Sequence, residues 1–461
     1  MNWAAGRTDP ESTGSVPELG RREVEMQNGL CSRFALWSML ALAGIGLARV
    51  QAQEDQPATG EGWTIEQVDI QEKPNHKFRG RVYFDQIWME DMQGPVLQSQ
   101  DNFTGFDTAR IGVTGNLYEN IKYCLEVEFE GGETDYKDIY GQVGNLPWLG
   151  HCQIGHYKEP FGIEELVSSR FDTFMEQSAP TVAFAPTRNM GVMFFDAVDA
   201  AENLSWYVGL FRGGSHDNRQ GRGTDDDGDS NDWSVTGRAV WLPYYDEATP
   251  GRCLLHCGLG CSFRRVGIDD DEGGNGGKLA GFLELNDRDG PINTYLPAFT
   301  EFEMLGTELA WMRGPLHVMN EFFFVDANTG ATPWGTYVEI GYFLTGENRG
   351  YKKSAKAFDR VKVHEPFFSV RTTEGVARGK GAWQVAARFT YLDLTGAGFQ
   401  PNTGLGVQRN FTFGLNWYLN SYNRMMLNYV HAVSDVTTGT GAFPVGTYEG
   451  DHFGVRYQID W

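Results

Sequence analysis

The sequence predicts an all-β fold: a transmembrane antiparallel β-barrel of about 16 strands with a long loop folded into its interior. Segments of about ten residues alternate between apolar and polar side chains, which is the length that a tilted strand needs to cross a bilayer. Short turns and long polar loops separate these segments. The composition, with 13% aromatic residues and 58 glycines, also favours a many-stranded architecture.

The first part of the chain is typical of a secretory signal peptide with an N-terminal extension. Three arginines precede an apolar run over residues 34–47, which is too short to span a bilayer. Small residues near Ala52 fit a cleavage site that would release the rest of the chain to the outer membrane of a Gram-negative type envelope. An uncleaved anchor is the alternative. The predicted domains are a signal peptide and extension, a polar leader and a barrel: 1–52, 53–77 and 78–461.

Alternating segments continue through the rest of the chain. The clearest of them are 121–130, 204–210, 234–241, 335–344, 383–391 and 411–419. In the first, Glu126, Glu128 and Glu130 share the polar face, which would line the lumen of a barrel.

A pair of carboxylates is expected further along the chain. If residues 314–315 form a two-residue turn, Glu308 lies opposite Glu321 on the polar face, and like charges in that arrangement are destabilising. We therefore expect a basic side chain or a cation between them. Screening by a water-filled lumen is the alternative.

The cysteines do not indicate a disulfide framework, because five follow residue 52 and their spacing is irregular. Cys253, Cys257 and Cys261 are four residues apart, so they share one face of a strand. There they would act as small apolar side chains, which we favour over a metal site. We expect no metal and no cofactor.

The stretch over residues 151–195 contains the long loop. Strands are predicted at 151–158 and 190–195, with about thirty residues between them. A loop this long is usually functional or disordered, and its many apolar residues argue against disorder. We therefore expect it to fold into the barrel.

The other connections fall into two classes. Short ones are predicted at 116–120, 314–315 and 420–423, and long polar ones at 212–232, 267–277, 346–379 and 435–451. We expect the short turns on one rim of the barrel and the long loops on the other.

The last alternating segment has an aromatic C-terminal residue. Its apolar face is formed by Phe453, Val455, Tyr457, Ile459 and Trp461. This pattern is similar to the signal that the barrel-assembly machinery recognises, so that machinery is an expected partner.

Several motifs in order resemble the phosphate-selective porin O and P family. They are K-E-P-F-G-x-E-E at 158–165, S-S-x-x-x-x-F-M-E at 168–176, A-F-A-P-T-R at 183–188, and further matches at 343–349, 381–383 and 414–420. The resemblance implies a sixteen-stranded porin, usually a homotrimer in the outer-membrane lipid, whose third extracellular loop constricts the pore. The segment 160–188 matches that loop.

The charges near the predicted constriction depart from this family. Its phosphate channels line the pore with many Arg and Lys, whereas residues 156–190 here hold three basic and five acidic residues. The positive candidates at the constriction are Lys158, Arg170 and Arg188. The negative candidates are Glu164, Glu165 and Glu176. Each could instead pin the loop to the wall by an ion pair.

The predicted function is a diffusion channel for small hydrophilic solutes or ions, with phosphate and other anions among the candidates. The acidic face at residues 126–130 and the net charge of -23 predict weak selectivity, with mild cation preference or near neutrality. The same negative charge disfavours nucleic acid as a partner.

Two alternatives stay open: a non-conducting structural or adhesive barrel, and an outer-membrane enzyme. We expect no enzyme, because no nucleophile and base are paired in the sequence. The acidic stretch 225–232 lacks the glycine and glutamate that an EF-hand calcium loop requires, so a solvated loop is favoured.

Overall fold

The computed structural model describes ten stretches of the chain: residues 75–132, 134–212, 233–265, 278–285, 289–295, 301–368, 370–373, 375–396, 404–439 and 443–461. The predicted signal peptide, the cleavage site at Ala52 and most of the leader lie outside these residues, as do the acidic stretches 225–232 and 269–272. No helix among the described residues is long and apolar enough to cross a bilayer.

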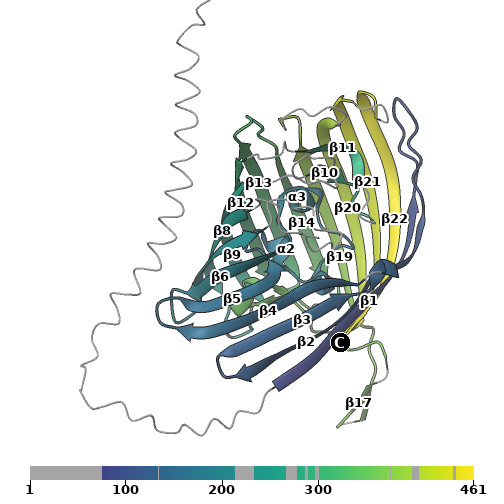
Figure 1. The fold of residues 1–461 in the computed structure, drawn as a ribbon. Helices are drawn as coiled ribbons and strands as arrows, with labels where there is room; N and C mark the ends of the chain where they lie inside the picture. Colours follow the sequence, from purple (N-terminus) through teal and green to yellow (C-terminus); the bar gives the residue numbers. More distant parts are fainter. Residues whose placement is uncertain are drawn as a thin grey trace, which may run out of the picture.

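Sixteen antiparallel strands form a closed barrel, which confirms the predicted fold class (Figure 1). They are β1 (Asn75–Met89), β2 (Phe103–Tyr118), β3 (Ile121–Glu128), β4 (Asp135–Leu146), β5 (Gly150–Lys158), β6 (Arg188–Ala197), β7 (Leu204–Arg212), β8 (Trp233–Tyr245), β9 (Cys253–Arg265), β12 (Glu301–Arg313), β13 (Leu316–Ala327), β14 (Trp334–Phe343), β19 (Ala382–Asp393), β20 (Leu405–Asn420), β21 (Asn423–Thr438) and β22 (Gly446–Asp460). β1 starts three residues before the predicted barrel boundary.

Side chains alternate between the lipid and the lumen along each strand. In β20, Phe411 and Phe413 are exposed on the outer face, while Asn410, Thr412 and Asn416 are buried inside. This is the pattern of a membrane barrel, because the lipid contacts the outer face and polar groups line the interior. The cysteine prediction agrees for β9, where Cys253 and Cys257 are free thiols that alternate with buried side chains.

The terminal strand closes the barrel. β22 pairs with β1, and the backbone of Trp461 exchanges hydrogen bonds with Gly80 at 3.2 and 3.0 Å. A Cβ atom at residue 80 would lie 2.2 Å from the Trp461 ring, so a larger residue there would displace this ring. Phe453, Tyr457 and Ile459 are exposed on the outer face of β22, as the alternation predicts.

The prediction for the rims needs one correction. Short turns at 119–120, 314–315 and 421–422 lie on one rim, but so does the long connection 344–381, which was predicted on the rim of the long loops. Antiparallel strands alternate in direction, so the number of preceding strands, and not the length of a connection, decides its rim. This connection contains β15 (Gly350–Lys352), η5 (Lys353–Ala355), β16 (Ala357–Asp359), β17 (Val370–Thr372) and β18 (Gly375–Ala377). β17 lies beyond the rim near the C-terminus (Figure 1).

Two insertions from the other rim fill part of the lumen. The first is the long loop of residues 159–187, here called the constriction loop. It contains α2 (Ile163–Leu166), η3 (Ser169–Phe171) and α3 (Ala179–Phe184). The second is the hairpin of β10 (Lys278–Phe282) and β11 (Asp289–Tyr295), which forms a sheet of its own. Both lie inside the ring of strands (Figure 1).

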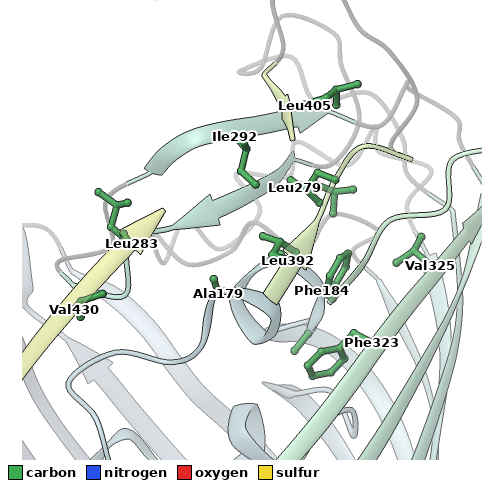
Figure 2. Packing of buried hydrophobic residues seen from close by; sticks show 14 of the residues in the cluster. Ala179, Phe184, Leu279, Leu283, Ile292, Phe323, Val325, Leu392, Leu405 and Val430 are labelled. Atoms are coloured by element: carbon green, nitrogen blue, oxygen red, sulfur yellow. The ribbon is translucent and has the colours of Figure 1, made fainter. Parts of the chain in front are cut away.

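Apolar side chains join the two insertions to the wall. Figure 2 shows Leu279 and Ile292 of the hairpin together with Phe184 of α3 and Leu392 of β19, all of which belong to one buried cluster. This burial keeps the constriction loop folded, since removal of apolar surface from water is the main stabilising force. The sequence correctly predicted an ordered, inward-folded loop.

Candidate pore constriction

The constriction loop is anchored at its start by a buried carboxylate. Glu159 is 0% exposed, and its carboxylate accepts hydrogen bonds from Arg264 Nη1 at 2.8 Å and from Thr236 Oγ1 at 2.5 Å. Asn189 Nδ2 donates to the same group at 2.6 Å. A buried charge needs such partners, because an unpaired one would be strongly destabilising.

The second anchor is Glu321 of β13. Its carboxylate accepts the backbone N–H groups of Ile163 at 2.6 Å and Glu164 at 3.0 Å, which are free at the start of α2. The register places Glu321 opposite Glu308, as predicted. Arg238 is a basic partner for Glu308, at 2.7 Å, whereas Glu321 accepts its hydrogen bonds from the two backbone N–H groups and from Tyr337. The expectation of a basic group is therefore met for Glu308 alone, and among the described residues no cation bridges the two carboxylates.

Glu164 is the third anchor and does not line the pore. Its carboxylate accepts a hydrogen bond from Arg388 Nη1 at 3.0 Å, and Arg388 also binds Glu284 of the hairpin at 2.7 Å. Glu284 in turn accepts the backbone N–H of Ala179 at 3.0 Å. The constriction loop, the hairpin and β19 are therefore joined by one ionic network.

Aromatic rings of the loop rest on glycines of the wall. A Cβ atom at Gly260 would lie 3.0 Å from the Phe161 ring, and one at Gly306 would lie 2.9 Å from it. Such distances are too short for a methyl group without movement of the ring. These glycines let the loop approach the wall closely.

A cavity of about 330 Å³ lies between the constriction loop and strands β1 to β6. Equal numbers of basic and acidic side chains, eight of each, line it. The basic ones are Arg79, Arg81, Arg110, Lys137, Lys158, Arg170, Arg188 and Arg456. The acidic ones are Asp107, Glu128, Glu130, Asp135, Asp138, Glu165, Asp172 and Glu176. Five of the six residues predicted at the constriction are thus in this lining; Glu164 is not.

Arginines of β1 and β2 form ion pairs with the acidic face that was predicted on β3. Glu126 is only 2% exposed, and its carboxylate binds Arg79 at 2.7 Å, Arg81 at 2.8 Å and Arg110 at 3.1 Å. Arg110 Nε also binds Glu128 at 2.7 Å. These arginines offset the negative charge on which the sequence-based expectation of cation preference rested.

Glu130 differs from the other two predicted glutamates. β3 ends at Glu128, and Glu130 begins a 3-10 turn, so it lies beyond the end of the strand at the rim of the long loops. It is exposed and still lines the cavity. The alternation of side chains between the two faces ends with the strand at Glu128, so it does not extend to Glu130.

The sequence reasoning missed the basic face of β1. Lys77, Arg79 and Arg81 are two residues apart, and in a strand this spacing places all three on the lumen side. The signal was visible in the sequence, but the predicted boundary at residue 78 assigned Lys77 to the leader.

Four of the predicted charges take part in three ion pairs that hold the loop. Lys158 binds Glu165 at 3.1 Å, Arg188 binds Asp138 at 2.8 Å, and Glu176 binds Arg456 of β22 at 3.0 Å. For these residues the structure supports pinning of the loop to the wall. Their side chains still line the cavity, so they also shape its charge.

Arg170 is different because no carboxylate of the described residues forms an ion pair with it. Its Nε donates to Ser168 Oγ at 3.1 Å, and its guanidinium lies 5.1 Å from the centroid of the Phe171 ring. Burial, followed by the positive charges of Arg81 and Arg79, lowers the pKa of Arg170 to about 10. It stays charged at neutral pH and lines the same cavity as Arg79 and Arg81.

Asp172 contributes a buried carboxyl to the same cavity. It is 7% exposed, and its Oδ1 has no hydrogen-bond partner among the described residues. Burial, followed by the nearby charge of Glu164, raises the pKa of Asp172 to about 7. Its charge therefore changes close to neutral pH.

A second cavity of about 540 Å³ lies nearer the short-turn rim. Lys77, Lys122 and Lys352 line it, together with His151. None of its lining residues in the described part of the chain is acidic. Both cavities lie along the wall from β1 to β6.

The comparison with known proteins identifies the family. Residues 82–461 match the sequence profile described as phosphate-selective porin O and P. The chain belongs to this family. A porin of the family forms a channel through the outer membrane, and this chain is such a channel. The rim of short turns is accordingly periplasmic, and the constriction loop is the third loop on the extracellular side.

Two relatives illustrate how far sequences in the family diverge. Porin O of Pseudomonas aeruginosa is 22% identical to this porin over 396 residues, which cover 77% of this chain and 81% of Porin O. An uncharacterized protein of Caulobacter vibrioides is 26% identical over 407 residues, which cover 84% of this chain and 74% of that protein.

Solved structures of other porins resemble this barrel. The anion-selective porin from Comamonas acidovorans has a TM-score of 0.46 at 13% identity, covering 84% of this chain and all (100%) of that one. The outer membrane channel DcaP of Acinetobacter baumannii has a TM-score of 0.49 at 10% identity, covering 84% and 97%. The trimer form of OmpT from Vibrio cholerae has a TM-score of 0.48 at 11% identity, covering 85% and 100%. These are similarities of the backbone fold.

Proposed function

We propose that this porin passes small hydrophilic anions in moderate preference to cations, along a path between the constriction loop and the wall of β1 to β6. The observation that carries this proposal is Arg170, which has no ion-pair partner among the described residues, lines the same cavity as Arg79 and Arg81, and donates to the same Ser168 hydroxyl as Arg81. Fixed positive groups gathered in the lining of one cavity concentrate anions there.

The acidic residues weaken this preference without reversing it. Glu126 is shared by three arginines, and Asp138 is paired with Arg188. In 0.15 M salt an exposed charge acts over about 8 Å, so only charges close to the narrow part decide which ion passes. Lys77, Lys122 and Lys352 line the second cavity, here called the periplasmic cavity, and act in the same direction as Arg170.

Tight phosphate binding does not follow from this arrangement. Phosphate recognition favours several cations that are free to form bidentate hydrogen bonds. Here Arg79, Arg81 and Arg110 already bind Glu126. We propose a selectivity filter that is weaker than the family description "phosphate-selective" suggests.

Reversal potentials in a potassium chloride gradient test the proposal. The unmodified porin should prefer chloride, and Arg170→Gln should move the reversal potential toward zero. Arg378→Gln is the matched control, because it removes the same charge from an exposed periplasmic position. A cation-selective unmodified porin, or an unchanged potential in Arg170→Gln, would contradict the role of Arg170. Block of chloride current by low phosphate would contradict the weak filter.

A homotrimer is the proposed assembly. One porin of similar fold, OmpT from Vibrio cholerae, has a structure that is described as a trimer form. Native mass spectrometry of the detergent-extracted porin should give three times the mass of the mature chain. A monomer under conditions that preserve the folded barrel would contradict this.

Two proposals concern export and assembly. Signal-peptide cleavage near Ala52 would be seen by N-terminal sequencing of the mature porin. Recognition of Phe453, Val455, Tyr457, Ile459 and Trp461 by the barrel-assembly machinery is supported by their position on the strand that closes the barrel. Trp461→Lys should reduce the amount of folded barrel in the membrane, and normal amounts would contradict this.

A further inference from the structure

The periplasmic connection between β14 and β19 folds back into the lumen beneath the constriction loop. Tyr351, Ala357 and Phe358 of this connection are buried in one apolar cluster with Ile163 and Val167 of the loop. The constriction loop, which enters from the extracellular rim, is thus supported by a segment from the opposite rim. Contacts between the two reach the tip of the loop.

Arg360, directly after β16, makes the contact nearest to the proposed filter. Its guanidinium lies 5.1 Å from the centroid of the Phe171 ring and 4.3 Å from that of Tyr422. It also forms an ion pair with the carboxylate of Asp460 in β22. Phe171 is the residue next to Arg170, and the Arg170 guanidinium lies over the same ring at 5.1 Å. One phenyl ring therefore contacts both guanidinium groups.

A second link lies two residues further along the loop. Arg349 Nη1 donates to Glu339 Oε1 at 2.9 Å, and the same oxygen accepts a hydrogen bond from Thr173 Oγ1 of the loop at 2.6 Å. Arg349 lies 3.9 Å from the centroid of the Phe358 ring. The periplasmic segment is therefore attached to the loop on both sides of Asp172.

Arg170 needs an external constraint in this position. Like charges repel, and Arg79 and Arg81 are close enough to lower its pKa. Its own hydrogen bond is to Ser168, which belongs to the same loop. The ring of Phe171 lies against the guanidinium, and the negative charge of Asp460, the ion-pair partner of Arg360, also opposes the repulsion.

We infer that Arg360 is a positioning residue for Arg170: it holds Phe171 from the periplasmic side and thereby keeps the Arg170 guanidinium in the narrow part of the pore. This inference rests on the proposed function of Arg170 as the cation that sets ion preference. The periplasmic segment thus contributes to selectivity although the loop that carries the filter is extracellular.

Two variants test the inference by planar bilayer measurements of the anion-to-cation permeability ratio. Arg360→Lys keeps the charge and can keep the ion pair with Asp460, but it loses the planar face that stacks on a ring. Phe171→Leu keeps an apolar side chain without a ring. Each should lower the ratio by about two- to fivefold, the range expected for loss of one cation–π contact. Arg378→Gln, an exposed charge change in the same segment, should leave the ratio unchanged.

A double variant separates positioning from a direct electrostatic effect. If Arg360 acts through Arg170, then Arg360→Lys should change nothing further in an Arg170→Gln background. An equal fall in both backgrounds would overturn the inference. If Arg170→Gln alone has no effect, the proposed function fails. If Arg170→Gln lowers the ratio but Arg360→Lys and Phe171→Leu do not, only the positioning role fails. All variants are compared as barrels that migrate as folded on unheated gels.

Discussion

Glu126 controls how much positive charge the constriction presents, because one carboxylate balances three guanidinium groups. It is almost fully buried, so water and salt screen it poorly. An anion in the cavity therefore meets arginines whose charge is partly offset. Glu126 therefore lowers the net positive charge at the constriction, and its hydrogen bonds orient the three arginines.

Glu126→Gln should raise the anion-to-cation permeability ratio by about fivefold, since a unit charge about 4 Å away is worth about 1 kcal/mol in water. The amide keeps the size of the side chain and can still accept hydrogen bonds from the arginines. Reversal potentials at low salt measure the change. Glu130→Gln removes the same charge at the exposed rim and should give a much smaller shift. Equal shifts in the two variants would mean that position within the pore does not matter.

Asp172 should give the porin a pH dependence close to neutrality. Its pKa is raised to about 7 by burial and by Glu164, so the carboxyl is neutral below this pH and negative above it. Lowering the pH from about 8 to about 6 therefore removes a negative charge from the cavity and should increase anion preference. The Asp172→Asn variant should have, at every pH in this range, the anion-to-cation permeability ratio that the unmodified porin has at about pH 6. If the permeability ratio of this variant still changed with pH by the same amount, the pH dependence would belong to another titratable group.

At the scale of elements, the constriction loop is held by carboxylates at its start and by apolar packing along its length. Its anchors come from strands far away in sequence: Arg264 and Arg388 are separated from the glutamates they bind by 105 and 224 residues. The loop itself was predictable, because a long segment between two strands carried many apolar residues. Its anchors were not, because no local pattern tells which wall residue a given glutamate will meet.

Removing the first anchor tests this description. Glu159→Ala leaves Arg264 buried without its carboxylate, a change that typically costs about 3–5 kcal/mol. The temperature at which the folded band disappears on gels should fall, and the single-channel current should become noisier as the loop loosens. Glu165→Ala is the matched control, since its partner Lys158 is partly exposed. If this temperature fell equally in both variants, the buried pair of Glu159 and Arg264 would have no special role in holding the loop.

At the scale of the whole molecule, the barrel is filled unevenly. Both cavities follow the wall from β1 to β6, whereas the buried apolar clusters that hold the inserted segments draw mainly on β8, β9, β12 to β14 and β19 to β22, with Ile87 and Met89 of β1. The sequence predicted the barrel, its strand number and its family from local alternation and motifs. It did not predict that Arg456 binds Asp85 and Glu176, because Arg456 and Asp85 meet only once β22 closes against β1. Closure is a global event that a count of charges along one loop cannot represent.

The periplasmic cavity has a consequence for the direction of current. Three lysines without a lining carboxylate occupy this end of the path, while the cavity beside the constriction loop holds equal numbers of both charges. A pore whose fixed charge differs between its two ends accumulates mobile ions at one voltage polarity and depletes them at the other. The porin should therefore rectify: at low salt, currents at equal positive and negative voltages should differ in size. Changing Lys77, Lys122 and Lys352 together to Gln should make the two currents nearly equal, and rectification that survives this change would have to originate at another part of the pore.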